Sequence, residues 1–212
     1  MSYNLEEQDQ IESLRDFWGR WGTPISSLVL VVALAWAGYA GWQWWQVRQT
    51  TQASALFAQV SKELQAGDLH KAAPAWTDLQ NKFPSSPYAQ MGGLRMAKAY
   101  ADAGQAAKAE DLLHWTSEHA ESTSYRAMAL LNLSALQVDA KQLQAALATV
   151  KKSPAPAFDA LFATRRGDIE VLLGKPQEAR KSYEDALQRL PTDSSYRQLV
   201  QIKLQSVGGL AS

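Results

Sequence analysis

The segment LRMAKAYADAG, residues 94–104, recurs 37 residues further along the chain as LNLSALQVDAK, residues 131–141. Each copy ends where one helix is expected to stop and the next to begin. Self-similarity with a period of about 20–50 residues is typical of repeat proteins. The same spacing reaches Gly67 before this pair and Gly174 after it. The sequence therefore predicts four units of 33–37 residues between about residue 52 and residue 191.

Each unit has the pattern of two amphipathic helices joined by a tight turn. In the second helix, a small residue allows a close helix crossing, and a larger apolar residue follows four positions later on the same face. A final helix, roughly Ser194 to Val207, is expected to cover the open apolar end of the last pair. No alternating apolar run suggests a strand, so the fold class is all-α, an α-solenoid of about four helix pairs plus a capping helix. The small and large residues are Ala72 and Trp76, Ala109 and Leu113, Ala146 and Val150, and Ala179 and Tyr183.

This pattern resembles the tetratricopeptide repeat, and the fourth unit resembles it most. The third unit departs from the family pattern because Lys141 replaces the turn glycine. The resemblance implies a right-handed stack of helix pairs whose concave face, lined by the first helix of each pair, holds a peptide or a partner's helix. The matching residues are Gly167, Gly174, Ala179, Tyr183, Ala186 and Pro191 in the fourth unit, and Gly67, Ala72, Trp76 and Pro84 in the first.

A membrane-spanning helix is predicted before the repeats. The 27 residues between Arg20 and Arg48 carry no charge, and their centre, residues 25–39, reads ISSLVLVVALAWAGY. A bilayer core needs about 20 apolar residues in a helix. Thr23-Pro24 is expected to begin this helix, with Thr as the cap and Pro in the first turn. Tryptophans suited to the two headgroup zones flank the span at positions 18, 21, 42, 44 and 45.

The predicted organisation is an amphipathic N-terminal segment (1–22), a transmembrane helix (23–47) and the repeat domain (48–212). A cleaved signal peptide is the competing interpretation, because Ala35-Trp36-Ala37 resembles a cleavage site. The acidic leading segment and the bulky WQWW that follows favour a retained anchor. Ala33, Ala37 and Gly41 share one helical face, which would let another helix approach closely, although chance recurrence of small residues remains open.

Composition argues against several classes of function. The chain has no cysteine, which excludes disulfides and thiolate sites. The 18 basic and 16 acidic residues from position 49 onward are interspersed, so nucleic acid is not an expected partner. His114 and His119 are five residues apart and lie on different helical faces, which does not suit a zinc pair. We expect neither an enzyme nor a cofactor.

The candidate binding residues lie on the first helix of units two, three and four. Methionine and leucine interleaved with charges suit loose contact with an apolar segment. The alternative, a merely solvated face, is left open by the sequence. The lysine and asparagine pattern of repeat modules that clamp a C-terminal carboxylate is not found. The candidates are Met91, Arg95, Lys98 and Asp102 in unit two, Met128, Asn132, Ala135 and Asp139 in unit three, and Leu161, Arg165, Asp168 and Leu172 in unit four.

The whole chain resembles one bacterial family. Residues 6–25, EEQDQIESLRDFWGRWGTPI, form an acidic amphipathic run that ends in FWGRWG directly before the anchor. Together with the tryptophan-rich segment and the repeats, this run is similar to the ancillary subunits of the SecYEG translocon (YfgM-like proteins). The resemblance implies an inner-membrane, single-pass protein with a cytoplasmic N-terminus and a periplasmic repeat domain. Charge counting alone leaves this orientation undecided.

The same resemblance supplies the expected partners and role. They are the SecYEG translocon, a membrane-anchored periplasmic folding factor of the parvulin type, unfolded or emerging secretory proteins and the lipid bilayer. The implied role is chaperone-like assistance to exported proteins. Two alternatives remain: an assembly factor for another envelope system such as cytochrome c maturation, and a scaffold that multimerises through Ala33, Ala37 and Gly41.

Overall fold

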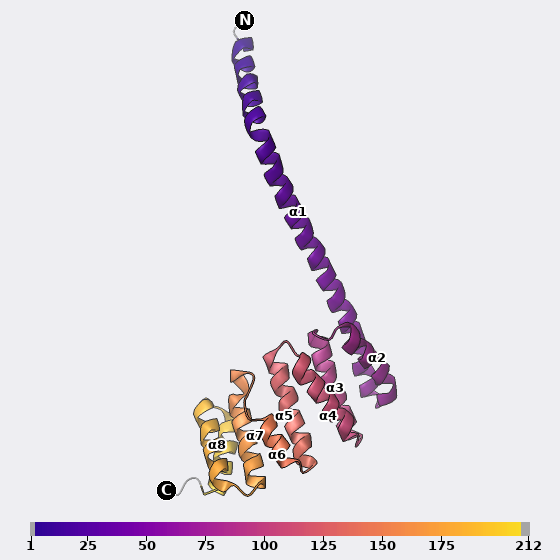
Figure 1. The fold of residues 1–212 in the computed structure, drawn as a ribbon, viewed down its shortest axis with the longest axis vertical. Helices are drawn as coiled ribbons and strands as arrows, with labels where there is room; N and C mark the ends of the chain where they lie inside the picture. The colour runs from indigo at the N-terminus through magenta and orange to yellow at the C-terminus, as the bar shows by residue number, and fades with distance from the viewer. Residues whose placement is uncertain (1–2, 209–212) are drawn as a thin grey trace. The chain divides into compact units, whose positions relative to one another are not determined.

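The computed structural model describes the backbone of residues 3–208 and the side chains of residues 15, 17–24 and 26–208. Every regular element in that part of the chain is helical (Figure 1). This confirms the predicted all-α class. The chain divides into two compact units, Met1–Thr51 and Gln52–Ser212. The helices are α1 (Tyr3–Gln65), α2 (Leu69–Lys82), α3 (Pro87–Asp102), α4 (Ala106–His119), α5 (Thr123–Asp139), α6 (Leu143–Thr149), the short 3-10 helix η1 (Pro156–Phe158), α7 (Asp159–Leu172), α8 (Pro176–Arg189) and α9 (Ser195–Ser206).

Within the second unit, consecutive helices pack as hairpins, and the predicted turns join them (Figure 1). The four turn residues all have positive φ, near 71–75° at Gly67, Gly104 and Gly174, and 63° at Lys141. Glycine adopts this left-handed conformation without strain, whereas a lysine does so at a cost of about 1 kcal/mol. Lys141 therefore occupies a turn position that the other three repeats give to glycine. The final helix, α9, has Ser194 as its cap and ends at Ser206, as expected.

The predicted small residues lie where helices cross. The alanines Ala72, Ala109, Ala146 and Ala179 are fully buried, and so is Val150. Glycines allow closer approach still in the first helices of the pairs. A Cβ atom on Gly93 would lie 2.3 Å from Oγ1 of Thr116. A Cβ atom on Gly167 would lie 2.6 Å from a ring carbon of Tyr183, which is 2% exposed. The core is therefore an interlock of small and large residues between paired helices.

The apolar span lies within α1, but α1 does not begin where the sequence suggested. The described part of the chain contains one helix that is long and apolar enough to span a membrane. Its most apolar stretch has a mean hydropathy of 1.7, and none of that stretch is buried within the protein. The helix continues through Pro24, so the expected start at Thr23-Pro24 is wrong. Proline removes one intrahelical hydrogen bond, which a long helix tolerates in an apolar span. The hydroxyl of Ser27 adds hydrogen bonds to the carbonyls of Thr23 (2.8 Å) and Pro24 (3.0 Å).

The second helix of the third pair is shorter than the repeat pattern predicts. Helices α2, α4 and α8 have 14 residues each, whereas α6 has seven. The chain leaves the helix at Val150 and passes through Ser153, Pro154 and Pro156 before α7 begins. Proline disfavours the helical conformation of the residue before it and supplies no N–H to the helix. Ser153-Pro154 therefore keeps the chain from continuing as a helix beyond Lys152, and residues 150–155 form a non-helical crossing segment.

Candidate partner-binding surface

The three charged candidate residues of α3, Arg95, Lys98 and Asp102, make contacts within the protein. The guanidinium of Arg95 donates a hydrogen bond to Oγ of Ser61 (2.9 Å) on α1 and lies 5.1 Å from the centre of the Phe57 ring. Lys98 is exposed and pairs with Asp102 at 2.8 Å, one turn further along the helix. Exposed pairs of this kind stabilise little, typically by under about 1 kcal/mol. Arg95 therefore joins the first helices of units one and two, and the Lys98–Asp102 pair remains accessible to a ligand.

Asp168 on α7 has a structural role that the sequence did not reveal. Its Oδ1 accepts hydrogen bonds from the Tyr183 hydroxyl (2.9 Å) on α8 and from the Lys203 ammonium (2.6 Å) on α9. Burial of the Tyr183 ring, followed by this hydrogen bond to Asp168, raises the pKa of the tyrosine. Two other candidates lie on α7 with Asp168: Arg165 is half-buried, and Leu172, at the end of the helix, is 57% exposed. Asp168 thus connects three helices, so a ligand would have to compete with these bonds.

The candidate residues of α5 include the groups that are free to bind a partner. Met128, Asn132, Ala135 and Asp139 follow one another at helical spacing on one side of the helix. Met128 is 41% exposed, and Asn132 and Asp139 are also exposed. Across residues 3–208, neither the Asn132 amide nor the Asp139 carboxylate has a side-chain hydrogen bond or ion pair. Desolvating these two groups would therefore break no bond within the chain.

Met91 is half-buried on α3, and Leu161 is half-buried on α7. The twelve candidates thus differ in accessibility. The α5 group is open, the α3 group is open at Lys98 and Asp102, and the α7 group is largely committed to packing. The most accessible candidates are therefore Met128, Asn132 and Asp139 on α5. We call these three residues the α5 face.

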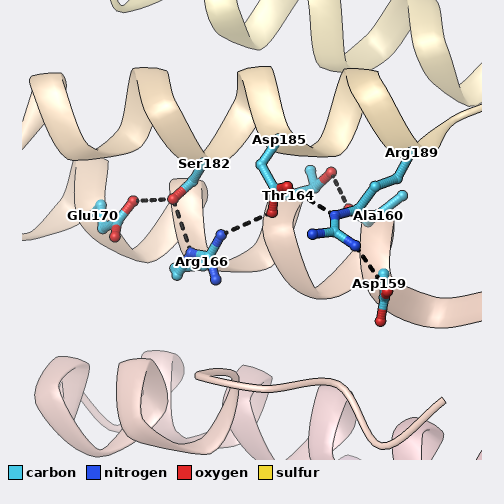
Figure 2. Close-up of polar contacts among 8 residues, drawn as sticks. All are labelled: Asp159, Ala160, Thr164, Arg166, Glu170, Ser182, Asp185 and Arg189. Carbon is cyan, nitrogen blue, oxygen red and sulfur yellow. Dashed lines mark hydrogen bonds and ion pairs between the residues drawn. The ribbon is translucent and has the colours of Figure 1, made fainter. Parts of the chain in front are cut away.

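A polar network between α7 and α8 was not anticipated from the sequence (Figure 2). Ser182 donates a 2.6 Å hydrogen bond to the carboxylate of Glu170, which is 8% exposed, and accepts one from Nε of Arg166 (3.0 Å). Arg166 also pairs with Asp185 at 3.2 Å. Arg166 and Glu170 are four residues apart on α7, and Ser182 and Asp185 are three apart on α8, so each pair lies on one face of its helix. The sequence alone does not show that these two faces meet, because the register of α7 against α8 is needed for that.

Arg189 extends this network to the start of α7. It pairs with Asp185 at 2.8 Å and with Asp159 at 2.9 Å. The hydrogen bond with Asp185 raises the pKa of Arg189, and Asp159 adds to the effect. A second charged group lies at the start of α2, where Lys71 donates from both its side chain and its backbone N–H to Asp68 and lowers the pKa of that carboxyl. Both arrangements therefore hold the ends of helices in place.

The histidines and the anchor complete the list of candidate sites. His119 stacks on Trp115 with ring centres 4.7 Å apart, and His114 lies 4.0 Å from Glu110. Among the residues described, no group of three His, Asp or Glu side chains is placed to hold a metal. Ala33, Ala37 and Gly41 are exposed in the single chain, and a Cβ atom on Gly41 would meet nothing within 4 Å. Their packing against another helix stays a prediction.

Residues 15–209 of the chain match the protein family described as a tetratricopeptide repeat-like domain. The ancillary SecYEG translocon subunit of Neisseria gonorrhoeae is 30% identical over 208 residues, which cover 98% of this chain and all of that protein. The protein of the same name from Haemophilus influenzae is 28% identical, over 89% of this chain and 92% of its own.

Solved structures share the fold at low sequence identity. A tetratricopeptide repeat protein from Parabacteroides merdae has a TM-score of 0.56 at 16% identity, over 75% of this chain and 61% of its own. The MamA protein has a TM-score of 0.53 at 20% identity, over 74% of this chain and 84% of its own. These similarities establish the helical repeat architecture and carry no information about the partner.

Proposed function

Because the chain belongs to the ancillary SecYEG translocon subunit family and carries its tetratricopeptide repeat-like domain, we propose that it is an accessory subunit of the Sec translocon. In this proposal α1 anchors the chain in the membrane, and the repeat domain binds other proteins without catalysing a reaction. The supporting observation within the molecule is the α5 face, an open set of apolar and polar groups on a rigid helical scaffold. Such a surface gains contacts from a partner without first breaking its own.

The proposal also assigns the parts of the chain and their sides of the membrane. Residues 1–22 are the cytoplasmic segment, residues 23–47 cross the inner membrane, and residues 48–212 are the periplasmic repeat domain. Six of the eight tryptophans lie between residues 18 and 45, and the Arg48 guanidinium lies 4.6 Å from the Trp44 ring. Indole rings and a nearby arginine are typical of a membrane interface, which supports an end of the span close to Trp44.

The role on the periplasmic side follows from the kind of surface available. Methionine adapts its shape to different apolar chains, and Asn132 and Asp139 offer polar contacts around it. We therefore assign to the α5 face the contact with the channel subunits, with extended segments of the proteins that emerge from them, and with a membrane-anchored parvulin-type folding factor. A chaperone-like role of this kind needs modest affinity and rapid release, which a small exposed face provides.

Native purification tests the proposed association. The tagged chain is extracted from membranes in mild detergent, and the channel subunits are quantified by mass spectrometry. We expect them to copurify with the wild type and to fall several-fold with the triple variant Met128→Glu/Asn132→Lys/Asp139→Lys. The matched control carries substitutions at Glu178 and Arg180, exposed residues of α8, and should behave as wild type. Copurification of cytochrome c maturation factors without any channel subunit would instead support the alternative envelope function.

A further inference from the structure

The short helix α6 opens a cleft in the wall of the solenoid. It has seven residues where the equivalent helices α2, α4 and α8 have 14. Seven residues of helix correspond to about 10 Å of length. The chain that replaces them, residues 150–156, does not fill the space beside α7 and α8. A cleft of about 460 Å³ remains there, a volume within the usual range for binding sites.

The cleft combines an apolar floor with charged walls. Phe162 and Ala163 of α7 are each 2% exposed and contribute to the floor together with Val150. Pro154 and Pro156 contribute further apolar surface from the crossing segment. The walls carry four basic and two acidic side chains, so the lining has a net positive charge. These are Lys151, Lys152, Arg166 and Arg189, and Asp159 and Asp185.

The walls are held in place before any ligand arrives. Arg166 and Arg189 both pair with Asp185, and Arg189 also pairs with Asp159 (Figure 2). In the crossing segment, Oγ of Ser153 donates to the carbonyl of Ala155 (2.7 Å) and accepts from its N–H (3.2 Å). Preorganisation of this kind reduces the conformational entropy lost on binding. The two acids are therefore neutralised by the arginines within the wall.

The excess positive charge is left on Lys151 and Lys152. Both side chains are exposed, and neither has an ion pair with any residue in the described part of the chain. We propose that this cleft binds an extended acidic segment of a partner protein, with its carboxylates beside Lys151 and Lys152 and an apolar side chain against Pro154 and Pro156. The site differs from the α5 face in its charge and in its residues, and it adds a second binding site to the proposed accessory subunit.

The test uses the full chain in nanodiscs of phosphatidylcholine, which carry no net charge. The probes are two pools of fluorescein-labelled heptapeptides with blocked ends, in which random apolar residues alternate with glutamate in one pool and with lysine in the other. Binding is measured by fluorescence anisotropy. We expect saturable binding of the glutamate pool only, and weaker binding as salt rises from about 0.05 M to about 0.5 M, because screening weakens exposed charge pairs.

Variants locate the binding site. Lys151→Glu/Lys152→Glu should weaken binding by about tenfold or more, because it reverses two charges at the cleft mouth. The matched control, Lys175→Glu/Lys181→Glu, makes the same change at exposed positions of α8 and its cap, outside the cleft lining, and should bind as wild type. Melting temperatures of both double variants equal to that of the wild type would show that neither has unfolded the domain.

Three results would overturn the proposal. One is failure of the glutamate pool to bind, and another is equal binding of both pools. The third is binding that survives reversal of Lys151 and Lys152 but is lost in the α5-face variant Met128→Glu/Asn132→Lys/Asp139→Lys. That third result would leave the proposed translocon association intact and would assign the acidic peptide to the α5 face.

Discussion

Gly167 and Tyr183 offer a direct test of the packing that stacks the repeats. Replacing a helix-interior glycine by alanine normally stabilises a protein by about 1 kcal/mol. At Gly167 the opposite is expected, because the new Cβ would lie 2.6, 2.8 and 3.0 Å from three carbons of the Tyr183 ring. Carbon atoms pack without strain at about 3.5–4.0 Å.

The ring cannot move freely to relieve this contact. Tyr183 is 2% exposed, and its hydroxyl is tied to Asp168 at 2.9 Å. Overpacking of this kind costs up to about 3 kcal/mol. After the propensity gain of about 1 kcal/mol is subtracted, Gly167→Ala should lower the free energy of unfolding by about 2 kcal/mol. For a repeat domain of this size the melting temperature should fall by about 4–8 °C.

A double-mutant cycle separates this clash from other effects. Unfolding of the full chain in detergent micelles is followed by circular dichroism at 222 nm, for wild type, Gly167→Ala, Tyr183→Leu and the double variant. Leucine is smaller and has no ring, so alanine at position 167 should be neutral or stabilising in that background. The expected coupling is about 2–3 kcal/mol. If alanine stabilised the wild type, or destabilised both backgrounds equally, the close-crossing account would be refuted.

Three further predictions concern turns, the polar network and a helix cap. Lys141→Gly should stabilise the domain by about 0.5–1 kcal/mol because it removes a positive-φ lysine. The control Lys175→Gly, at a residue with φ of −112°, should be neutral or slightly destabilising in the same urea titration. Ser182→Ala should cost about 1–3 kcal/mol in that assay because it leaves the carboxylate of Glu170 buried without this donor. The lowered pKa of Asp68 means that its stabilising effect is present at neutral pH and is lost as the pH falls. The stability advantage of wild type over Asp68→Asn should therefore shrink from about pH 5 to about pH 2, and a constant advantage would contradict the assignment.

The repeat spacing predicted the helix pairs because the constraints that create it are local. A turn needs a residue with positive φ, and a close crossing needs a small residue four positions before a large one. Ala179 and Tyr183 satisfied the second rule, and both are buried as expected. Lys141 could be identified as the degenerate turn residue for the same reason, since the equivalent positions hold glycine.

Features that depend on competing local signals were harder to predict. Thr23-Pro24 has the composition of a helix start, yet α1 runs through it because the apolar residues on both sides also favour helix. Ser153-Pro154 is also a hydroxyl residue followed by proline, and there the chain is not helical. The difference lies in the context of each proline, which capping rules do not include.

Contacts between helices were not predictable from the single sequence. The Arg166–Ser182–Glu170 network requires the register of α7 against α8, and the bonds of Asp168 require the position of α9. The twelve candidate residues were chosen by helical face alone. Face periodicity placed the candidates on one side of each first helix, but it could not distinguish the open α5 face from the half-buried or hydrogen-bonded residues of α3 and α7.

Site-specific photocrosslinking in intact cells tests the central claim most directly. A photoreactive phenylalanine analogue is placed at Asn132 on the α5 face, and at Glu178 on α8 as the control. After illumination, adducts are identified by mass spectrometry. The account predicts adducts with a subunit of the Sec channel, with a membrane-anchored folding factor or with exported proteins from position 132, and none of these from position 178. Adducts from position 132 only with proteins that are neither exported nor part of the export machinery, or equal channel adducts from both positions, would contradict it.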